Sequence, residues 1–213
     1  MKYVLCVLLV LGLVACGQTN NTTSYLPPLP SPVLPTSSIQ SIVGSYNQWR
    51  EAQGQEDIIP GLNCALYSTP TATAIIGTVL NSGGVNPYVG SFEYLSNFNV
   101  PDELTSVGNP IFPSALQSVY QNSYILKCIG FLVITSSGYA EFDTSSDDGS
   151  NLYVDGVLVV NNDGLHGIQT VSNVRNLQMN VHSFELDYLQ GAGYQALIVN
   201  MNGALLPSAN LYH

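Results

Sequence analysis

The chain has 213 residues, which suits one domain of ordinary size with extensions. Charged residues make up only 8% of the composition and hydrophobic residues 46%, a mixture typical of an extracytoplasmic, β-rich protein. Fourteen acidic residues against four Lys and Arg give a net charge of −10. This balance argues against nucleic acid as a partner, because phosphate binding depends on Lys and Arg. It is compatible with cations, neutral sugars and basic surfaces.

The N-terminus has the features of an export signal. Lys2 supplies a positive charge, and residues 4–14 form a short apolar run. This run of eleven residues is shorter than the roughly 20 that a helix needs to cross a bilayer. We therefore expect residues 1–15 to be a signal peptide.

A cysteine stands at the end of this signal. The run Leu13-Val14-Ala15-Cys16-Gly17 resembles the lipobox of bacterial lipoproteins. The resemblance implies cleavage before Cys16 and lipidation of its thiol, which would anchor the protein to a membrane of the cell envelope. Because Gly17 rather than Asp follows the cysteine, we expect the outer membrane if the cell has one.

Two of the four cysteines remain for the folded domain. Cys6 leaves with the signal peptide and Cys16 carries the lipid, so Cys64 and Cys128 are left in an oxidising compartment. We expect them to form a disulfide, which closes a long loop and could stabilise the fold by up to about 4 kcal/mol. Two buried free thiols are the alternative.

A tether and a helix precede the main domain. Residues 16–36 are rich in Asn, Thr, Ser and Pro, which predicts a disordered, polyproline-like stalk. Residues 37–54 have the apolar spacing of an amphipathic helix. We expect the apolar face of this helix, including the single Trp49, to pack on the core, with partner binding as the alternative. The apolar face consists of Ile39, Ile42, Val43, Tyr46 and Trp49.

Short apolar runs separated by turn residues fill residues 58–206. This pattern predicts an antiparallel β-sandwich or barrel, with a hairpin at Asp155-Gly156. Residues 101–113 are predicted to be an irregular loop, and residues 115–120 fit a helical turn or a strand. The predicted strands are 62–67, 74–80, 92–98, 124–135, 138–144, 151–154, 157–161, 182–188 and 195–200.

The loop 144–151 contains two adjacent acids, Asp147 and Asp148. The nearest basic residues in the sequence are Lys127 and Arg175. Adjacent carboxylates repel, so the pair needs a counterion, an unusual pKa or full exposure to water. A hard cation such as Ca²⁺ would satisfy both through oxygen ligands. A solvated turn is the alternative, because Ser-Asp and Asp-Gly sequences favour turns.

Three segments in sequence order resemble the PA-fourteen domain, the β-sandwich named after anthrax protective antigen. They are Ser146-Asp147-Asp148-Gly149-Ser150 followed by Leu152-Tyr153-Val154-Asp155-Gly156, then Asn162-Asp163-Gly164-Leu165-His166-Gly167, then Leu189-Gln190-Gly191-Ala192-Gly193. The resemblance covers roughly residues 60–205. It implies an all-β fold, an antiparallel β-sandwich of the PA-fourteen type, here preceded by one short amphipathic helix and the disordered tether.

The resemblance also implies a calcium site. In the carbohydrate-binding members of that family, two adjacent Asp residues joined by a cis peptide bond hold Ca²⁺, and Asp147 and Asp148 match them. Ca²⁺ takes six to eight oxygens. We expect the others from the amide of Gln190 and the carbonyls of Gly191 and Gly193, since glycines let carbonyls turn inward.

A sugar would complete the calcium shell with vicinal hydroxyls. The residues expected around this ligand are Asn162, Asp163, His166 and Tyr194, of which the first two also compete as calcium ligands. The function implied is calcium-dependent binding of a glycan or cell-surface carbohydrate by an envelope lipoprotein. The alternative is a lipoprotein that uses the same fold for structure or protein contacts.

Enzyme signatures are weak in this sequence. An EF-hand is excluded because placing Gly149 at loop position 6 puts Thr144 and Ser146 at ligand positions that need carboxylates. No His-Glu-x-x-His or Gly-x-Ser-x-Gly motif is present. Glu141 and Asp143 share one strand face, which we interpret as a solvated face rather than a glycosidase pair. We expect no enzymatic activity.

Overall fold

A computed structural model describes residues 37–69, 76, 88–104, 110–114, 116, 123–191 and 193–213. The predicted signal peptide, lipidated cysteine and tether lie outside these residues, as do nearly all of segments 74–80 and 115–120. Within the described part of the chain, no helix is both long enough and apolar enough to cross a membrane.

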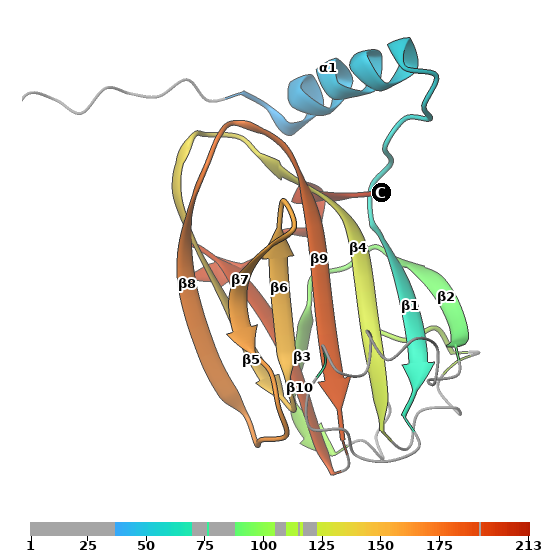
Figure 1. Cartoon of the computed structure of the whole chain (residues 1–213), viewed down its shortest axis with the longest axis vertical. Coiled ribbons are helices and arrows are strands. Elements are labelled where there is room, and N and C mark those ends of the chain that lie inside the picture. Colours follow the sequence, from blue (N-terminus) through green and yellow to red (C-terminus); the bar gives the residue numbers. More distant parts are fainter. Residues whose placement is uncertain are drawn as a thin grey trace, which may run out of the picture. The chain divides into compact units, whose positions relative to one another are not determined.

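The described strands form two antiparallel sheets, arranged as two layers (Figure 1). The larger sheet has the order β2-β1-β4-β9-β6-β7, and β12 also pairs with β4. The smaller sheet has the order β11-β10-β5-β8, and β3 also pairs with β10. This arrangement is the predicted antiparallel β-sandwich.

The strands of the larger sheet are β1 (Leu62–Ser68), β2 (Tyr88–Tyr94), β4 (Tyr124–Ile134), β6 (Ser150–Val154), β7 (Val157–Asn162), β9 (Asn180–Gln190) and β12 (Leu211–Tyr212). Those of the smaller sheet are β3 (Asn99–Leu104), β5 (Gly138–Asp147), β8 (Gln169–Leu177), β10 (Tyr194–Met201) and β11 (Ala204–Leu205). A short 3₁₀ helix, η3 (Ser208–Asn210), precedes β12.

The core fills the space between the sheets. Successive side chains of a strand point to opposite faces, so on β5 Phe142 and Thr144 are fully buried while Glu141 is exposed. Each fully buried large apolar side chain contributes about 1.5–3 kcal/mol of hydrophobic stabilisation. The largest of them are Tyr124, Tyr188, Phe98, Phe142 and Phe184.

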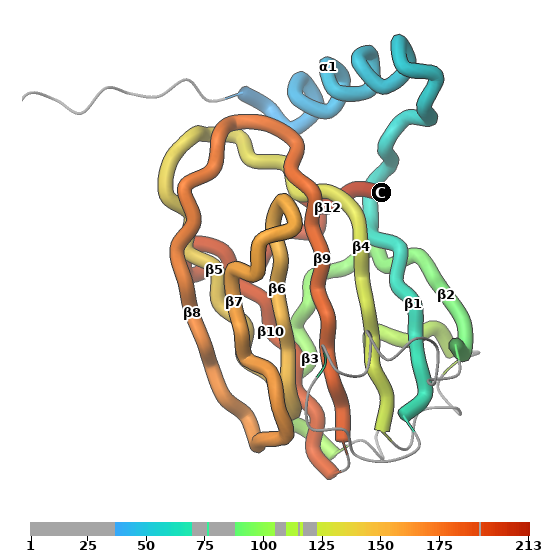
Figure 2. Tube along the Cα trace, viewed as in Figure 1, coloured from blue at the N-terminus to red at the C-terminus, as the bar shows by residue number. Residues whose placement is uncertain are grey.

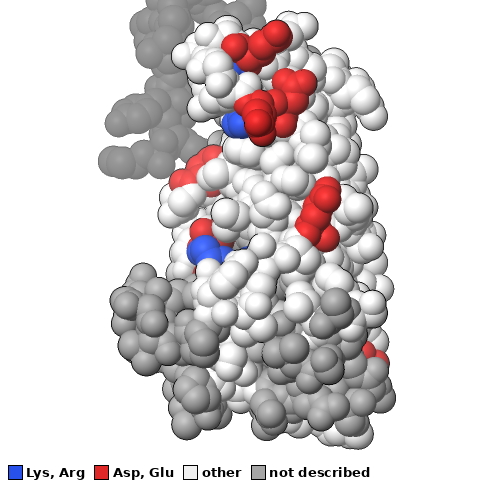
Figure 3. All heavy atoms as spheres, turned by 90° about the vertical axis from the view of Figure 1, so that its right-hand side faces the viewer, with Lys and Arg blue, Asp and Glu red and all other residues white. Residues whose placement is uncertain are grey.

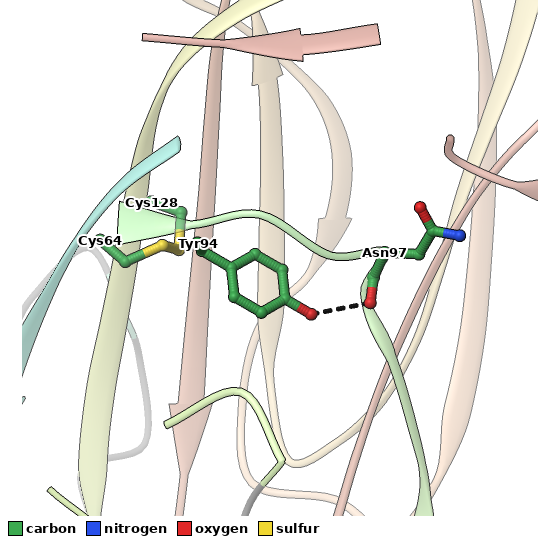
Figure 4. Close-up of a disulfide and its surroundings, with 4 residues drawn as sticks. All are labelled: Cys64, Tyr94, Asn97 and Cys128. Carbon is green, nitrogen blue, oxygen red and sulfur yellow. Dashed lines mark hydrogen bonds between the residues drawn. A yellow bond between two sulfur atoms is a disulfide. The ribbon is translucent and has the colours of Figure 1, made fainter. Parts of the chain in front are cut away.

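The predicted disulfide is confirmed. Cys64 on β1 lies directly opposite Cys128 on β4, both are fully buried, and their Cα atoms are 4.0 Å apart. Beside the disulfide, the hydroxyl of Tyr94 donates to the carbonyl of Asn97 at 2.7 Å (Figure 4). The bridge thus ties together two neighbouring strands of the larger sheet.

The predicted helix is confirmed, but its apolar face is only half-buried against the domain, and Trp49 is exposed. Helix α1 (Ile39–Ala52) begins at Ser38, whose side chain accepts from the Ser41 N–H, and it has no buried residue. Trp49 is 54% exposed and stacks on Tyr46, whose ring meets Phe131 of β4 edge-on. The helical period identifies which face is apolar, but not how much of the sheet lies against it.

Two other expectations need correction. The predicted strand 92–98 spans the end of β2 and the turn before β3, and the predicted loop 101–113 begins inside β3. Pro101 is tolerated in β3 because it falls where the pairing with β10 shifts register, so its missing N–H costs no ladder bond. Strand β8 was not predicted from the sequence. It is an edge strand with mostly exposed side chains and therefore shows no clear apolar alternation.

Candidate functional site

Three turns meet at one end of the sandwich. They follow β5, β7 and β9 and comprise, among the described residues, 147–150, 163–168, 190–191 and 193–194; they lie at the lower end in Figure 2. The first of these turns contains the acidic pair, and the peptide bond between Asp147 and Asp148 is cis. The antiparallel pairing of the strands therefore brings together segments more than 40 residues apart.

Asp148 connects all three turns. Its side chain is 8% exposed, and one carboxylate oxygen accepts a hydrogen bond from the backbone N–H of His166 at 3.0 Å. The other oxygen accepts from the N–H of Gly191 at 2.6 Å. The structure thus places an ionisable group where two loops supply donors to it.

Two glycines allow this close approach. A Cβ atom on Gly149 would lie 2.7 Å from the backbone nitrogen and oxygen of Gly164. A Cβ atom on Gly191 would lie 2.8 Å from the Asp148 Oδ2 atom and 3.3 Å from a methyl carbon of Leu165. The three turns can pack together only because neither position carries a side chain.

Asp147 is half-buried beside Asp148. The pKa of Asp147 is raised to about 6, mainly by burial and then by the charges of Asp148 and Asp102, while His166 acts in the opposite direction. Among the described residues, no ion pair involves Asp147 or Asp148. The pair is therefore held together without a Lys or Arg counterion.

Gln190 lies in the site but is arranged differently from the prediction. Its side chain is fully buried, and its Nε2 donates to the carbonyl of Tyr194 at 2.7 Å. Its Oε1 lies 2.5 Å from the hydroxyl of Tyr188, which is also 2.6 Å from the carbonyl oxygen of Asp147. The amide oxygen of Gln190 is thus engaged inside the domain rather than free for a cation.

The two predicted glycine ligands also differ from each other. The N–H of Gly191 serves Asp148, and its carbonyl accepts from the hydroxyl of Ser123 at 3.2 Å. Gly193 has a φ of +107°, in the left-handed region that favours glycine, and a Cβ there would meet open space. Of these two carbonyls, that of Gly193 is the better candidate for an external ligand.

Asn162 belongs to an internal network rather than to the open site. It is 1% exposed, and its amide donates to the Ser146 hydroxyl at 2.9 Å and to the Gln169 carbonyl at 3.0 Å. Its oxygen accepts from the Gln169 side chain at 3.0 Å. Ser146, in turn, shares a hydrogen bond with Ser150. This network therefore connects β5, β6, β7 and β8 next to the acidic turn.

Asp163 is also engaged by the protein. Both of its carboxylate oxygens lie within hydrogen-bond distance of the Ile76 N–H, at 2.8 and 3.0 Å. The structure therefore gives Asp163 the role of a loop anchor, which its sequence context did not indicate.

His166 and Tyr194 flank the acidic pair. The two ring nitrogens of His166 lie 3.1 Å from the Asn162 carbonyl and 2.9 Å from the Gly167 carbonyl. Because carbonyls only accept, both contacts are hydrogen bonds only when both ring nitrogens are protonated. Tyr194 is 52% exposed and Leu165 is 45% exposed, so the site has an apolar rim.

Comparisons with known proteins agree with this architecture. Residues 114–207 match the family model of the PA14 domain, the PA-fourteen domain named above. The PA14 sugar-binding domain from an RTX adhesin shares 19% sequence identity with a TM-score of 0.60, covering 73% of this chain and 99% of that chain. Proteins with curated descriptions gave no match to the sequence.

Two further solved structures share the fold. The PA14 domain of the MpAFP antifreeze protein is 15% identical with a TM-score of 0.59, covering 74% of this chain and 92% of that one. The Epithelial Adhesin 6 A domain from Candida glabrata, solved in complex with Galb1-3GlcNAc, is 12% identical with a TM-score of 0.51, covering 73% and 87%. The described domain is thus an antiparallel β-sandwich of the class to which these solved structures belong. Within it, residues 114–207 match the PA14 family model.

Proposed function

We propose that this protein is a cell-envelope lipoprotein whose PA14 domain binds carbohydrate in a calcium-dependent manner, as lectins and adhesins do. The observation that carries the proposal is the arrangement of Asp147 and Asp148. Two carboxylates lie side by side without a basic partner, and one of them is fixed by N–H groups from two separate loops. A divalent cation would offset the repulsion that this arrangement retains.

The donor set fits a hard cation. The carboxylates of Asp147 and Asp148 would hold Ca²⁺, with the carbonyl of Gly193 as a third source of oxygen. Ca²⁺ takes six to eight oxygen ligands, so water and ligand hydroxyls would supply the remainder. The bound ion would supply a fixed positive charge for neutral vicinal hydroxyls.

The surroundings of the acidic pair suit a sugar. The exposed ring of Tyr194 offers an apolar surface for one face of a pyranose, with its hydroxyl as a polar tip. The net charge of −10, seen also in the excess of acidic over basic groups on the face in Figure 3, disfavours anionic ligands in general. Two of the structurally similar domains, described above, are a sugar-binding domain and an adhesin solved with a disaccharide.

The envelope location is supported by the sequence alone. The signal-like residues 1–15 and the lipobox around Cys16 support export and lipid anchoring, which would present the site outside the cytoplasm. Mass spectrometry of the mature protein purified from cells that express the full-length chain tests this part, because a lipidated Cys16 has a characteristic added mass.

A glycan array with and without EDTA tests the central proposal. We expect binding in calcium that EDTA abolishes, and calorimetric Ca²⁺ binding that Asp147→Asn removes. The matched control is Glu141→Gln, which neutralises an exposed acid on the outer face of the same strand. Unchanged Ca²⁺ binding by Asp147→Asn overturns the site assignment. Silence of the wild type on a broad array favours the structural or protein-binding role.

A further inference from the structure

A single buried hydroxyl lies between the acidic turn and the loop after β9. Tyr188 is 1% exposed, and its hydroxyl oxygen is 2.6 Å from the Asp147 carbonyl oxygen and 2.5 Å from Gln190 Oε1. Gln190 continues the connection, because its Nε2 donates to the Tyr194 carbonyl at 2.7 Å. An unbroken series of short contacts therefore runs from one predicted calcium ligand to the exposed aromatic residue.

The orientation of the Gln190 amide follows from its partners. The Tyr194 carbonyl only accepts, so the nitrogen of the amide must face it and the oxygen must face Tyr188. The Tyr188 hydroxyl has one proton, whereas the Asp147 carbonyl and the Gln190 oxygen both require a donor. The hydroxyl of Tyr188 thus faces acceptors of both the acidic turn and the loop, and its side chain also hydrogen-bonds that of Tyr124.

We propose that Tyr188 is a positioning residue that couples the Asp147–Asp148 turn to the loop bearing Tyr194, through Gln190. This inference rests on the proposed calcium-dependent function of the site. Holding the Asp147 carbonyl sets the direction of the carboxylate next to it. Holding Gln190 sets the Tyr194 backbone, so occupation of the cation site and orientation of the sugar-facing loop depend on the same hydroxyl.

Tyr188→Phe tests the coupling because it removes the hydroxyl and keeps the ring. The matched control is Tyr94→Phe, which removes another buried hydroxyl donating to a backbone carbonyl, that of Asn97 (Figure 4). Tyr94 pairs with Leu62, at the end of β1 away from the acidic turn. Both variants lose a buried hydrogen bond and should lose similar thermal stability.

The readouts are Ca²⁺ affinity by calorimetry, Tb³⁺ luminescence as a second metal probe, and amide hydrogen exchange of residues 188–196 without metal. We expect Tyr188→Phe to lower the affinity for both metals about tenfold and to speed amide exchange at Gly191 and Tyr194. A tenfold loss of affinity matches the free energy that a lost buried hydrogen bond typically costs. Tyr94→Phe should leave affinity and exchange at these residues unchanged.

Gln190→Met separates the two halves of the connection. It breaks the link to the Tyr194 carbonyl and leaves the contact between Tyr188 and Asp147 in place. Its sugar affinity should therefore fall more than its Ca²⁺ affinity.

The outcomes distinguish this inference from the proposed function. If the wild type binds no metal, the proposed function is wrong, and the metal-free exchange comparison still decides whether Tyr188 orders the loop. If the wild type binds metal and Tyr188→Phe behaves like Tyr94→Phe in affinity and exchange, the positioning role is overturned.

Discussion

The Asp148 carboxylate and the Gly191 N–H lie 2.6 Å apart although 43 residues separate them in the chain. This contact fixes a side chain of the acidic turn against the backbone of another loop. Backbone donors cannot be removed by substituting their own side chains, so the contact is changed most directly by altering the space around it. Two glycines at the site offer that opportunity.

Gly191→Ala should weaken metal binding. The added Cβ would lie 2.8 Å from Asp148 Oδ2, closer than atoms can remain without a shift, so the carboxylate or the loop must move. We expect at least a fivefold loss of Ca²⁺ affinity by calorimetry, within the usual cost of about 1–3 kcal/mol for overpacking. Gly167→Ala is the control, because its Cβ meets open space in the neighbouring loop. Equal affinities of the two variants would contradict the geometry described for Asp148.

Gly149→Ala should destabilise the fold itself. Its Cβ would lie 2.7 Å from backbone atoms of Gly164, which cannot rotate away as a side chain can. We expect the free energy of unfolding to fall by about 1–3 kcal/mol in urea denaturation. Gly44→Ala, in helix α1 with nothing near its Cβ, should instead stabilise by about 0.5–1 kcal/mol. An unchanged free energy of unfolding in Gly149→Ala would contradict this tight packing of the turns.

Asp187 should make stability depend on pH. It is 2% exposed, and burial raises its pKa to about 7 from 3.8, although Lys127, 3.5 Å from its Oδ1, acts to lower it. The folded protein therefore binds more protons than the unfolded chain between these values. Its free energy of unfolding should fall as pH rises through that window.

Asp187→Asn should reduce this dependence between about pH 4 and 7, because the substituted side chain does not titrate, while Asp147, whose pKa is also raised, still contributes. Urea denaturation at several pH values measures the slope. Asp57→Asn, at an exposed position, serves as the control and should leave the slope unchanged. An unaltered slope in Asp187→Asn would show that another group titrates in this range.

Removing the disulfide should lower stability substantially. Cys64 and Cys128 are 64 residues apart in sequence, so in the chain-entropy model their bridge contributes up to about 4 kcal/mol by restricting the unfolded state. The Cys64→Ala/Cys128→Ala variant should unfold at lower urea concentration than the oxidised wild type. A reductant should destabilise the wild type only. Insensitivity of the wild type to reductant in urea would contradict this expectation.

The acidic turn could be found from the sequence because its composition is unusual. Two adjacent carboxylates far from any Lys or Arg stand out in a chain with so few charges, and the surrounding turn residues mark a loop. The role of Gln190 could not be found, because its orientation depends on Tyr188 and on a backbone carbonyl of Tyr194. Residues 182–188 are predicted as a strand, but a strand prediction does not indicate what the hydroxyl of Tyr188 contacts.

Strands could be predicted from the sequence where apolar and polar residues alternate. Strands with one buried face, such as β5, show alternation, whereas the exposed edge strand β8 does not. Asn162 is predicted to lie beside the ligand, yet it is buried, because its partners Ser146 and Gln169 meet it only after the sheets have formed. Trp49 shows the opposite case, an apolar side chain with too little neighbouring surface to cover it.

The direction of the strands has a mechanical consequence. The Ser37 N–H donates to the Thr135 carbonyl, just beyond the end of β4, whereas the acidic turn lies at the far end of the ten-residue β5, about 30 Å away. Tension between these two points would run along the strands. β4 and β9 pair over eleven residues, so their hydrogen bonds would share the load and resist shear together instead of opening one by one.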